Sequence, residues 1–479
     1  MKSLNKDIKL NIKYIKNKFE NVGGFVERII KKGKAQIYLY YIQGSSDSKY
    51  IADSIVKPLN EYKGETISPE IINEKVLCVG EISAEWDLDK GIDELVQGKC
   101  LLLFPNSKEF LIVSTDSFPE RSVEEPPTSS VLQGPREGFV ENYKTNISLI
   151  NKILSTPHLK SEKIVVGRYT KTNVVIMYLD DVCDLSMVKK VKDRIKRIDI
   201  DGVLDSYYVS AYLEEHPASF FKQIGNAEKP DIVCGKMLEG RLCVIVDGSP
   251  MVLTLPYMLF EDIQKSEDYY NSSLRATLLR WLRLFSIFTT LMLPGLYISV
   301  QLYHYKVIPL TFLITVVNST QGIPLSPFAE ILFVLVLFEI LYEASLRMPK
   351  YLGMAMSIVG ALILGDTAVK AGLISPPAVM IVALSGITLY TIPEQIGVLS
   401  ILRIMYTLAG GVLGFYGMIL FTLYLYFFLN NFDNYGVPYF APFTPRVSPD
   451  LKDGFFKKSI VHMKYRPVSL HNKNKRRQK

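Results

Sequence analysis

Charged residues interrupt an apolar segment, residues 330–350, and could form an ion pair or line an ion path. The segment reads EILFVLVLFEILYEASLRMPK and contains Glu330, Glu339, Glu343 and Arg347. A charged side chain at the centre of a bilayer costs about 2.5 to 3.5 kcal/mol on insertion scales. These groups must therefore face protein, water or a partner. Three of them recur every fourth residue, which predicts one stripe on a helix, whereas Glu330 points to nearly the opposite side.

The stripe has two interpretations. Glu343 and Arg347 are spaced to form an ion pair near the cytoplasmic end of the helix. Glu339 lies deeper and has no evident partner in the sequence. We therefore expect either packing between subunits or an ion path at Glu339.

The next apolar segment, residues 352–370, differs because it is rich in glycine, alanine and serine. Small residues allow membrane helices to approach closely. Asp366 and Lys370 follow an apolar set, and an apolar ring below a charged mouth is what a dewetting gate requires. The apolar set consists of Val359, Leu362 and Ile363. Tight packing inside one subunit explains the same residues equally well.

These segments belong to an apolar half of the chain. Apolar stretches cover residues 284–303, 328–346, 352–368, 376–393 and 398–429. A spanning helix needs about 20 mainly apolar residues, so we expect four to six crossings, with 307–325 as a re-entrant or short one. The last stretch is either one long tilted helix or two pieces that break at Gly410 and Gly411.

The half of the chain before residue 284 is charged and mixed, and it begins without a secretory signal pattern. Helical and strand-like patterns recur on both sides of EEPPTSS, including predicted hairpins over 98–117 and 240–256. The five cysteines are scattered and read as reduced core residues. The pattern predicts an α+β soluble cytoplasmic region of two small subdomains, followed by an α-helical polytopic membrane domain. The expected boundaries are 1–128, 129–283, 284–430 and a basic cytoplasmic tail, 431–479.

Motifs for enzymatic chemistry are missing from the sequence. It contains neither GxxxxGK[ST] nor GxGxxG, and DIDG at 199–202 lacks the further ligands of a calcium loop. We therefore expect no enzyme, no cofactor and no metal. The net charge is +7, and the basic tail is typical of a cytoplasmic segment near anionic lipid. We expect no nucleic-acid binding.

The stretch QGPREGFVENYKTNISLI, residues 133–150, resembles a signature of the A subunit of GerA-family spore germinant receptors. Further similar stretches cover most of residues 133–453 in the expected order. They are SYYVSAYLEEHPASFF, EKPDIVCGKMLEGRLCVIVDGSPMVLTLP, EDYYNSSLRATLLRWLR, EASLRMPKYLGMAMSIVGALILG and NYGVPYFAPFTP. The chain departs from the family at AEKPD, where the family often has Thr-Glu-Arg-Pro-Asp. The first 130 residues show little specific resemblance.

The resemblance implies a receptor subunit in the spore inner membrane, with its amino-terminal domain and its tail in the cytoplasm. Its implied partners are a transporter-like B subunit and a C lipoprotein. It further implies a homo-oligomer, expected to be a pentamer, that forms a nutrient-gated cation channel; the alternative is a non-conducting scaffold or signalling subunit. The family's PRE-type motif corresponds to Gly134, Pro135, Arg136 and Glu137.

Overall fold

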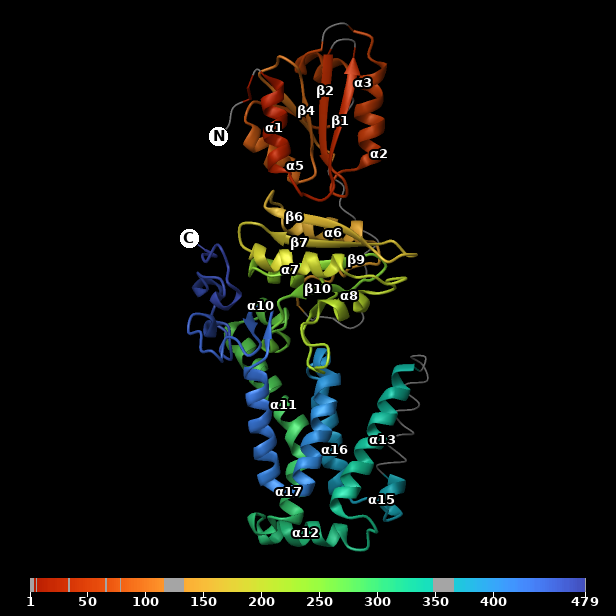
Figure 1. Cartoon of the computed structure of the whole chain (residues 1–479), viewed down its shortest axis with the longest axis vertical. Coiled ribbons are helices and arrows are strands. Elements are labelled where there is room, and N and C mark those ends of the chain that lie inside the picture. The colour runs from red at the N-terminus through yellow and green to blue at the C-terminus, as the bar shows by residue number, and fades with distance from the viewer. Residues whose placement is uncertain are drawn as a thin grey trace. The chain divides into compact units, whose positions relative to one another are not determined.

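The computed structural model of the chain describes residues 4–5, 7–32, 35–64, 67–77, 79–115, 133–347 and 366–478. Two compact units divide the chain. The first, here called the α/β unit, comprises Met1–Pro217, Gln223–Tyr257 and Ile460–Lys479. The second, the helical unit, comprises Ala218–Lys222 and Met258–Ser459. Figure 1 labels many of the elements of both.

The first subdomain of the α/β unit has an antiparallel sheet with strand order β1-β2-β4-β5-β3. Its strands are β1 (Phe25–Lys32), β2 (Ala35–Ile42), β3 (Ile82–Glu85), β4 (Cys100–Leu103) and β5 (Phe110–Val113). Its helical segments are α1 (Ile8–Lys18), α2 (Ser48–Ile51), η1 (Ala52–Val56), α3 (Lys57–Glu61), α4 (Pro69–Lys75) and α5 (Leu88–Val96). Helices α1 and α5 cover one face of the sheet, while α2 to α4 cover the other. The predicted hairpin over 98–117 is confirmed as β4 and β5.

The second subdomain repeats this topology, with strand order β6-β7-β9-β10-β8. Its strands are β6 (Leu159–Val166), β7 (Thr172–Leu179), β8 (Gly225–Ala227), β9 (Leu242–Val246) and β10 (Val252–Leu255). Its helices are α6 (Tyr143–Ile153), α7 (Leu185–Lys196), α8 (Ser206–Leu213) and α9 (Pro230–Leu238). If α2, η1 and α3 count as one helical stretch, both subdomains follow the order helix, two strands, two helices, strand, helix, two strands. The α/β unit is therefore an internal duplication of one topology.

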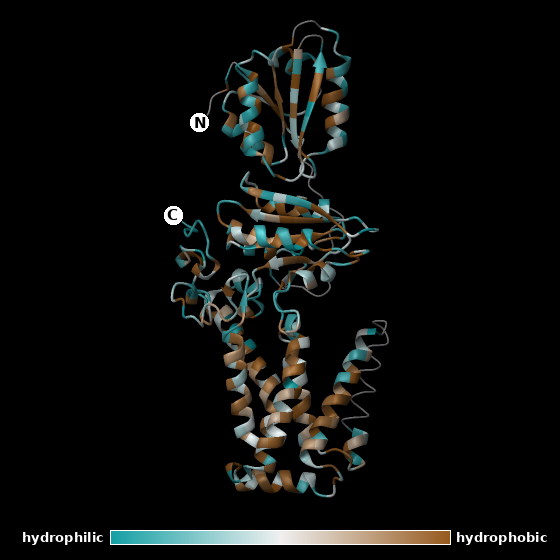
Figure 2. Ribbon diagram, viewed as in Figure 1, coloured by the Kyte–Doolittle hydropathy of each residue, from teal (hydrophilic) through white to brown (hydrophobic). Residues whose placement is uncertain are grey.

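The helical unit contains α10 (Glu267–Tyr270), α11 (Ser273–Leu302), α12 (Leu310–Thr320), α13 (Pro327–Arg347), α15 (Ala368–Lys370), α16 (Pro376–Leu389) and α17 (Ile396–Asn430). Apolar residues dominate long stretches of these helices (Figure 2). Among the described residues, two helical stretches, Ser273–Leu302 and Pro393–Asn430, are long and apolar enough to cross a membrane by length and composition. The first begins before the predicted boundary at 284, because Arg280 and Arg283 lie inside the helix and are buried there.

Helix α17 reverses direction at Gly414, which has φ 60° and ψ −146°. The hydroxyl oxygens of Tyr406 and Thr422 are 3.0 Å apart although sixteen residues separate them along the chain. Sixteen residues of straight helix would span about 24 Å. The two arms, 396–413 and 415–430, therefore fold into a hairpin (Figure 1). Of the two predicted alternatives for this stretch, the broken helix is found, with its break at Gly414.

The carboxyl-terminal segment is folded, in contrast to the single tail predicted for residues 431–479. Residues 431–459 belong to the helical unit, where β11 (Asp433–Asn434) pairs with β12 (Val437–Pro438). Residues 460–479 belong to the α/β unit. There the backbone N–H of Lys473 donates to the carbonyl oxygen of Val182 at 3.0 Å, and Arg466 Nε donates to that of Leu238 at 2.7 Å. The basic composition alone gives no sign of these contacts.

Candidate functional site

An ion pair joins α13 to the first arm of α17. Arg403 Nη2 donates to Glu339 Oε1 at 2.5 Å, and Arg403 Nη1 lies 3.5 Å from the hydroxyl oxygen of Ser385 on α16. Arg403 is only 2% exposed. The structure therefore gives Glu339 the partner that the sequence did not reveal, and three helices meet at this cation.

The other charged residues of α13 have separate partners. Glu330 is buried, and its Oε1 accepts a hydrogen bond from the backbone N–H of Ser375, the N-cap residue of α16. A carboxylate is favoured there because the first N–H groups of a helix lack partners within the helix and carry partial positive charge. Arg347 Nε donates to Glu343 Oε1 at 2.9 Å, and both side chains are exposed. The stripe thus contains one inter-helix pair and one surface pair.

Of the predicted gate, the described residues include only the charged mouth. Asp366 and Lys370 form an exposed ion pair, with 2.7 Å between Oδ1 and Nζ. Val359, Leu362 and Ile363 lie outside the described residues. Their role as a constriction stays a prediction.

The GPRE motif lies at the surface of the α/β unit. Gly134 has φ 125°, which favours glycine, and Gly134, Pro135 and Arg136 are exposed. Glu137 Oε1 lies 3.1 Å from Lys152 Nζ of α6. The chain is fixed just beyond the motif, where the backbone N–H of Phe139 donates to the Glu228 carbonyl at 2.7 Å.

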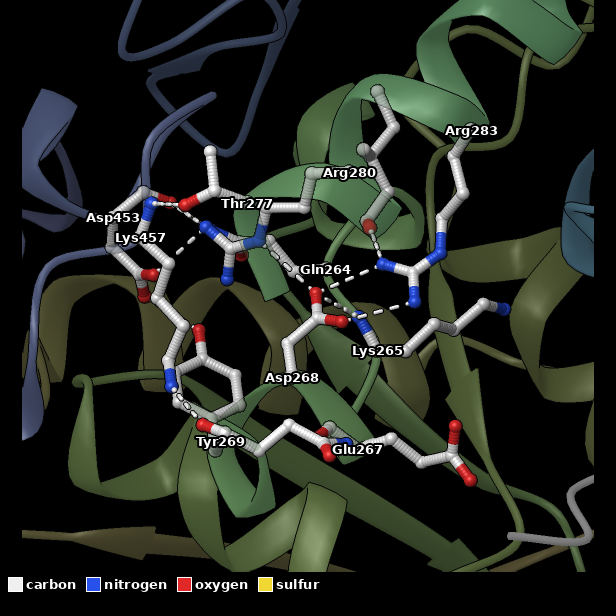
Figure 3. Close-up of polar contacts among 12 residues, drawn as sticks. Gln264, Lys265, Glu267, Asp268, Tyr269, Thr277, Arg280, Arg283, Asp453 and Lys457 are labelled. Carbon is white, nitrogen blue, oxygen red and sulfur yellow. Dashed lines mark hydrogen bonds and ion pairs between the residues drawn. The ribbon is translucent and has the colours of Figure 1, made fainter. Parts of the chain in front are cut away.

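A buried carboxylate lies between two arginines where α11 begins (Figure 3). Asp268 has no exposed surface. Its Oδ2 accepts from Arg280 Nε at 3.0 Å and from Arg283 Nη1 at 2.9 Å, while its Oδ1 accepts from Arg283 Nη2 at 3.0 Å. Two guanidinium groups therefore share one carboxylate, and the paired charges hold α10 against α11.

The same cluster holds the segment that follows α17. Arg280 Nη1 donates to the carbonyl oxygens of Asp453 and Gly454 at 2.8 and 2.7 Å. Its distance to Asp453 Oδ1 is 2.9 Å. Beside this pair, burial lowers the pKa of Lys457, and the Asp453 carboxylate partly offsets that effect. Helix α11 and the post-helical segment are thus joined by charge-assisted contacts (Figure 3).

A five-residue loop, Ala218–Lys222, belongs to the helical unit although both flanking segments belong to the α/β unit. Phe221 is buried, and its ring centroid lies 5.8 Å from that of Phe428 on α17 and 6.3 Å from that of Tyr439. The Tyr439 hydroxyl donates to the Lys222 carbonyl at 2.9 Å. Lys222 Nζ lies 3.2 Å from Asp262 Oδ2. The polypeptide thus leaves the α/β unit, binds beside the end of α17, and returns.

Only one group among the described residues has metal-ligand geometry. The ligand atoms of His158, Asp180 and Asp181 lie within 4.8 Å of one another. His158 Nδ1 is already 2.8 Å from Asp180 Oδ1, and Lys160 Nζ lies 3.8 Å from Asp180 Oδ2. A surface ion-pair cluster accounts for this arrangement.

Sequence reasoning missed the residues that connect distant elements. Arg403 could have been noticed in the sequence, because it is a lone charge within the apolar stretch 398–429 and therefore needs a partner. Arg280 and Arg283 lie in the charged half of the chain before residue 284, so composition assigns them to the soluble region. Phe221 gave no signal at all, since an aromatic residue in a connecting loop has no periodic pattern.

Comparisons with known proteins agree with the resemblance stated above. The family model described as Bacillus/Clostridium GerA spore germination protein matches residues 13–469. The chain is similar to spore germination protein KA of Bacillus subtilis (strain 168), with 36% identity over 475 residues, which cover 98% of this chain and 87% of that protein. It is similar to spore germination protein A1 of the same organism, with 31% identity, covering 94% of this chain and 92% of that protein.

A solved structure is also similar, namely the crystal structure of the N-terminal domain of the A subunit of the Bacillus megaterium spore germinant receptor GerK3. It shares 30% identity, covers 53% of this chain and 96% of its own, and has a TM-score of 0.43.

Proposed function

The chain belongs to the GerA family of spore germination proteins, and from this premise we propose that it is the A subunit of a nutrient-gated receptor in the spore inner membrane. In this proposal, copies of the chain assemble, with a pentamer expected, into a channel that releases cations when nutrient binds. The partners are a transporter-like B subunit and a C lipoprotein. The GerA family is one of spore germination proteins, and no enzymatic activity is proposed for this chain.

The observation that carries the proposal is the reversed polarity of the helical unit. Charged and polar side chains lie inside it, including Glu330, Arg403 and Thr290, which are at most 2% exposed. Large apolar side chains on α16 and α17 lie outside, including Ile387 and Val412. A water-soluble bundle has the opposite arrangement. This polarity fits helices that are surrounded by lipid and use polar contacts among themselves.

The contacts of the loop Ala218–Lys222 are the argument that a signal passes through this loop to the helices. Phe221 packs beside α17, and Lys222 is paired with Asp262, whose Oδ2 also accepts from Gln395 Nε2 at 2.9 Å. Gln395 directly precedes α17. A displacement of this loop would therefore act on both ends of the α17 hairpin.

The test is conduction by the purified oligomer in a planar lipid bilayer. We expect potassium currents, and we expect Val359→Ala or Leu362→Ala to conduct without nutrient. Ile387→Ala is the matched control, because it shortens an exposed apolar side chain on α16. If the two variants behave as the control does, the gate assignment is wrong.

A scaffold that does not conduct is the second candidate. It is favoured by the contacts of four carboxylates in the helical unit, since each already binds a protein group. Glu330 accepts from the Ser375 backbone, and the ion pairs are Glu339 with Arg403, Glu343 with Arg347, and Asp366 with Lys370. An assembled receptor that supports germination yet carries no current would select this function.

Assembly has its own test at the GPRE motif. If the exposed motif contacts a neighbouring subunit, Arg136→Ala should reduce the recovery of oligomer in detergent. Lys152→Ala, which breaks the pair with Glu137, is the control. Unchanged oligomer size in Arg136→Ala would place the motif outside the subunit interface.

A further inference from the structure

One face of α11 is apolar and exposed from its first turn. We call this surface the outer face; it consists of Leu274, Leu278, Trp281, Leu282, Phe285 and Phe288. Successive members are separated by one, three or four positions and fall on one side of a helix with 3.6 residues per turn. Leu274 is 85% exposed and Trp281 is 49% exposed. The stripe thus begins well before residue 284, where the apolar run of the sequence starts.

The opposite face of the same turns is polar and buried. Its buried side chains include those of Arg280, Arg283, Ser286 and Thr290. Burying an apolar side chain stabilises a protein in water by about 1.5 to 3 kcal/mol. A helix that buries arginines and exposes leucine, phenylalanine and tryptophan to water forgoes that gain at every turn. The outer face must therefore be covered by an apolar medium.

We propose that phospholipid covers the outer face, so that the membrane interface reaches the first turn of α11. The proposal rests on the membrane placement in the proposed function and extends it to residues 274–283. Helix α11 has 30 residues, which correspond to about 45 Å, whereas a bilayer including its headgroup regions is about 40 to 45 Å thick. The helix is thus long enough to pass through both headgroup layers.

The size of the side chains distinguishes lipid from a second copy of the chain. Helices that pack against each other in membranes use small residues at the contact. Close contact of that kind occurs elsewhere on α11, where a Cβ on Gly295 would lie 2.7 Å from the Tyr406 carbonyl oxygen. The outer face has only large side chains, which suit acyl chains.

The surroundings of Trp281 match a headgroup layer. Its ring centroid lies 5.8 Å from that of Phe456, which is itself exposed. Aromatic side chains, Trp and Tyr above all, are enriched at membrane interfaces. Two exposed cations lie near these rings in the sequence, Arg275 before Trp281 and Lys458 after Phe456. Such cations attract lipid phosphate. The outer face therefore continues onto the segment after α17.

The chain contains two tryptophans, Trp86 and Trp281, so intrinsic fluorescence can test the proposal. The full-length Trp86→Phe variant is reconstituted in phosphatidylcholine vesicles with acyl chains brominated near the headgroup or near the methyl end. We expect bromine near the headgroup to quench Trp281 most strongly. The Trp281→Phe variant, which keeps the exposed Trp86, should be quenched by aqueous iodide and not by bromine.

Three outcomes would overturn the proposal or its premise. Quenching of Trp281 by iodide alone would place it in water, and protection from both quenchers would place it against another protein chain. Failure of the protein to float with the vesicles would instead refute the membrane placement. Should Trp86→Phe misfold, the wild-type protein can be used instead. Its fluorescence should then divide into a fraction quenched by iodide, from Trp86, and a fraction quenched by bromine, from Trp281.

Discussion

Glu339 of α13 and Arg403 of α17 form an ion pair across 64 positions of sequence, with a nitrogen–oxygen distance of 2.5 Å. The guanidinium is buried, and it also lies within 3.5 Å of Ser385 on α16. In the proposed membrane this cation could not be released into lipid without a cost. The pair therefore fixes the relative positions of three helices.

Replacing Arg403 with methionine should leave Glu339 unpaired beside an apolar bundle. Leaving a fully buried charge unpaired costs about 3 to 5 kcal/mol. The Glu339 side chain is 31% exposed, so we expect a smaller loss than that, seen as a fall in the melting temperature of the protein in detergent. The double variant Glu339→Gln/Arg403→Met should recover part of the loss, because it leaves no unpaired charge. Arg347→Met, at the exposed pair with Glu343, is the control and should cost at most about 1 kcal/mol.

Asp268→Asn should destabilise the start of α11. The substitution removes the only negative charge that both Arg280 and Arg283 contact directly among the residues described, and the two buried cations would then repel each other. We expect a loss of about 3 to 5 kcal/mol, measured as urea resistance of the full chain in detergent. Asp366→Asn, at an exposed pair, should change stability little. Equal effects of the two variants would contradict the role given to the cluster.

Local sequence patterns predicted the strands and helices. For the stretch 398–429 they allowed either one long helix or a broken one, and the structure decides between the two. The hairpin over 240–256 appears as β9 and β10 because two short apolar runs around an Asp-Gly turn are local signals. The break in 398–429 falls at Gly414, since Gly410 and Gly411 are used for contact. A Cβ at Gly410 would lie 2.6 Å from the Gly295 carbonyl oxygen, and one at Gly411 would lie 2.2 Å from the Phe328 ring. Spacing alone does not distinguish a glycine that turns from one that packs.

The charged site could be predicted only where its partners are close in sequence. The pair of Glu343 and Arg347 follows from helical spacing. The partners of Glu339 and Asp268 come from other elements, so they depend on how the helices pack. Positions 359, 362 and 363 lie outside the described residues, and the gate assignment there stays a prediction from sequence.

Phe221→Ala should weaken the response of spores to nutrient. The substitution removes a buried ring that packs against Phe428 and Tyr439, and truncation of a buried Phe typically costs about 3 to 5 kcal/mol. We expect slower loss of optical density in spores exposed to a nutrient mixture that triggers the wild type. The amount of protein in the spore membrane is measured in parallel. Phe220→Ala, at the exposed neighbouring ring, should respond normally, and a normal response of Phe221→Ala at normal abundance would refute the coupling role.

Gly414→Ala should disrupt the α17 hairpin. At φ 60° and ψ −146° an alanine is strained by about 1 to 3 kcal/mol, and its Cβ would lie 3.0 Å from the Tyr303 ring. The hairpin can be followed with a bifunctional maleimide that joins Tyr406→Cys to Thr422→Cys, because the parent hydroxyls touch across the two arms and the spacer makes up the length of the lost Tyr ring. We expect this cross-link to form readily with Gly414 and much less with alanine there. Gly397→Ala is the control, because a Cβ at this position meets nothing within 4 Å, and efficient cross-linking in Gly414→Ala would show that the reversal does not require glycine.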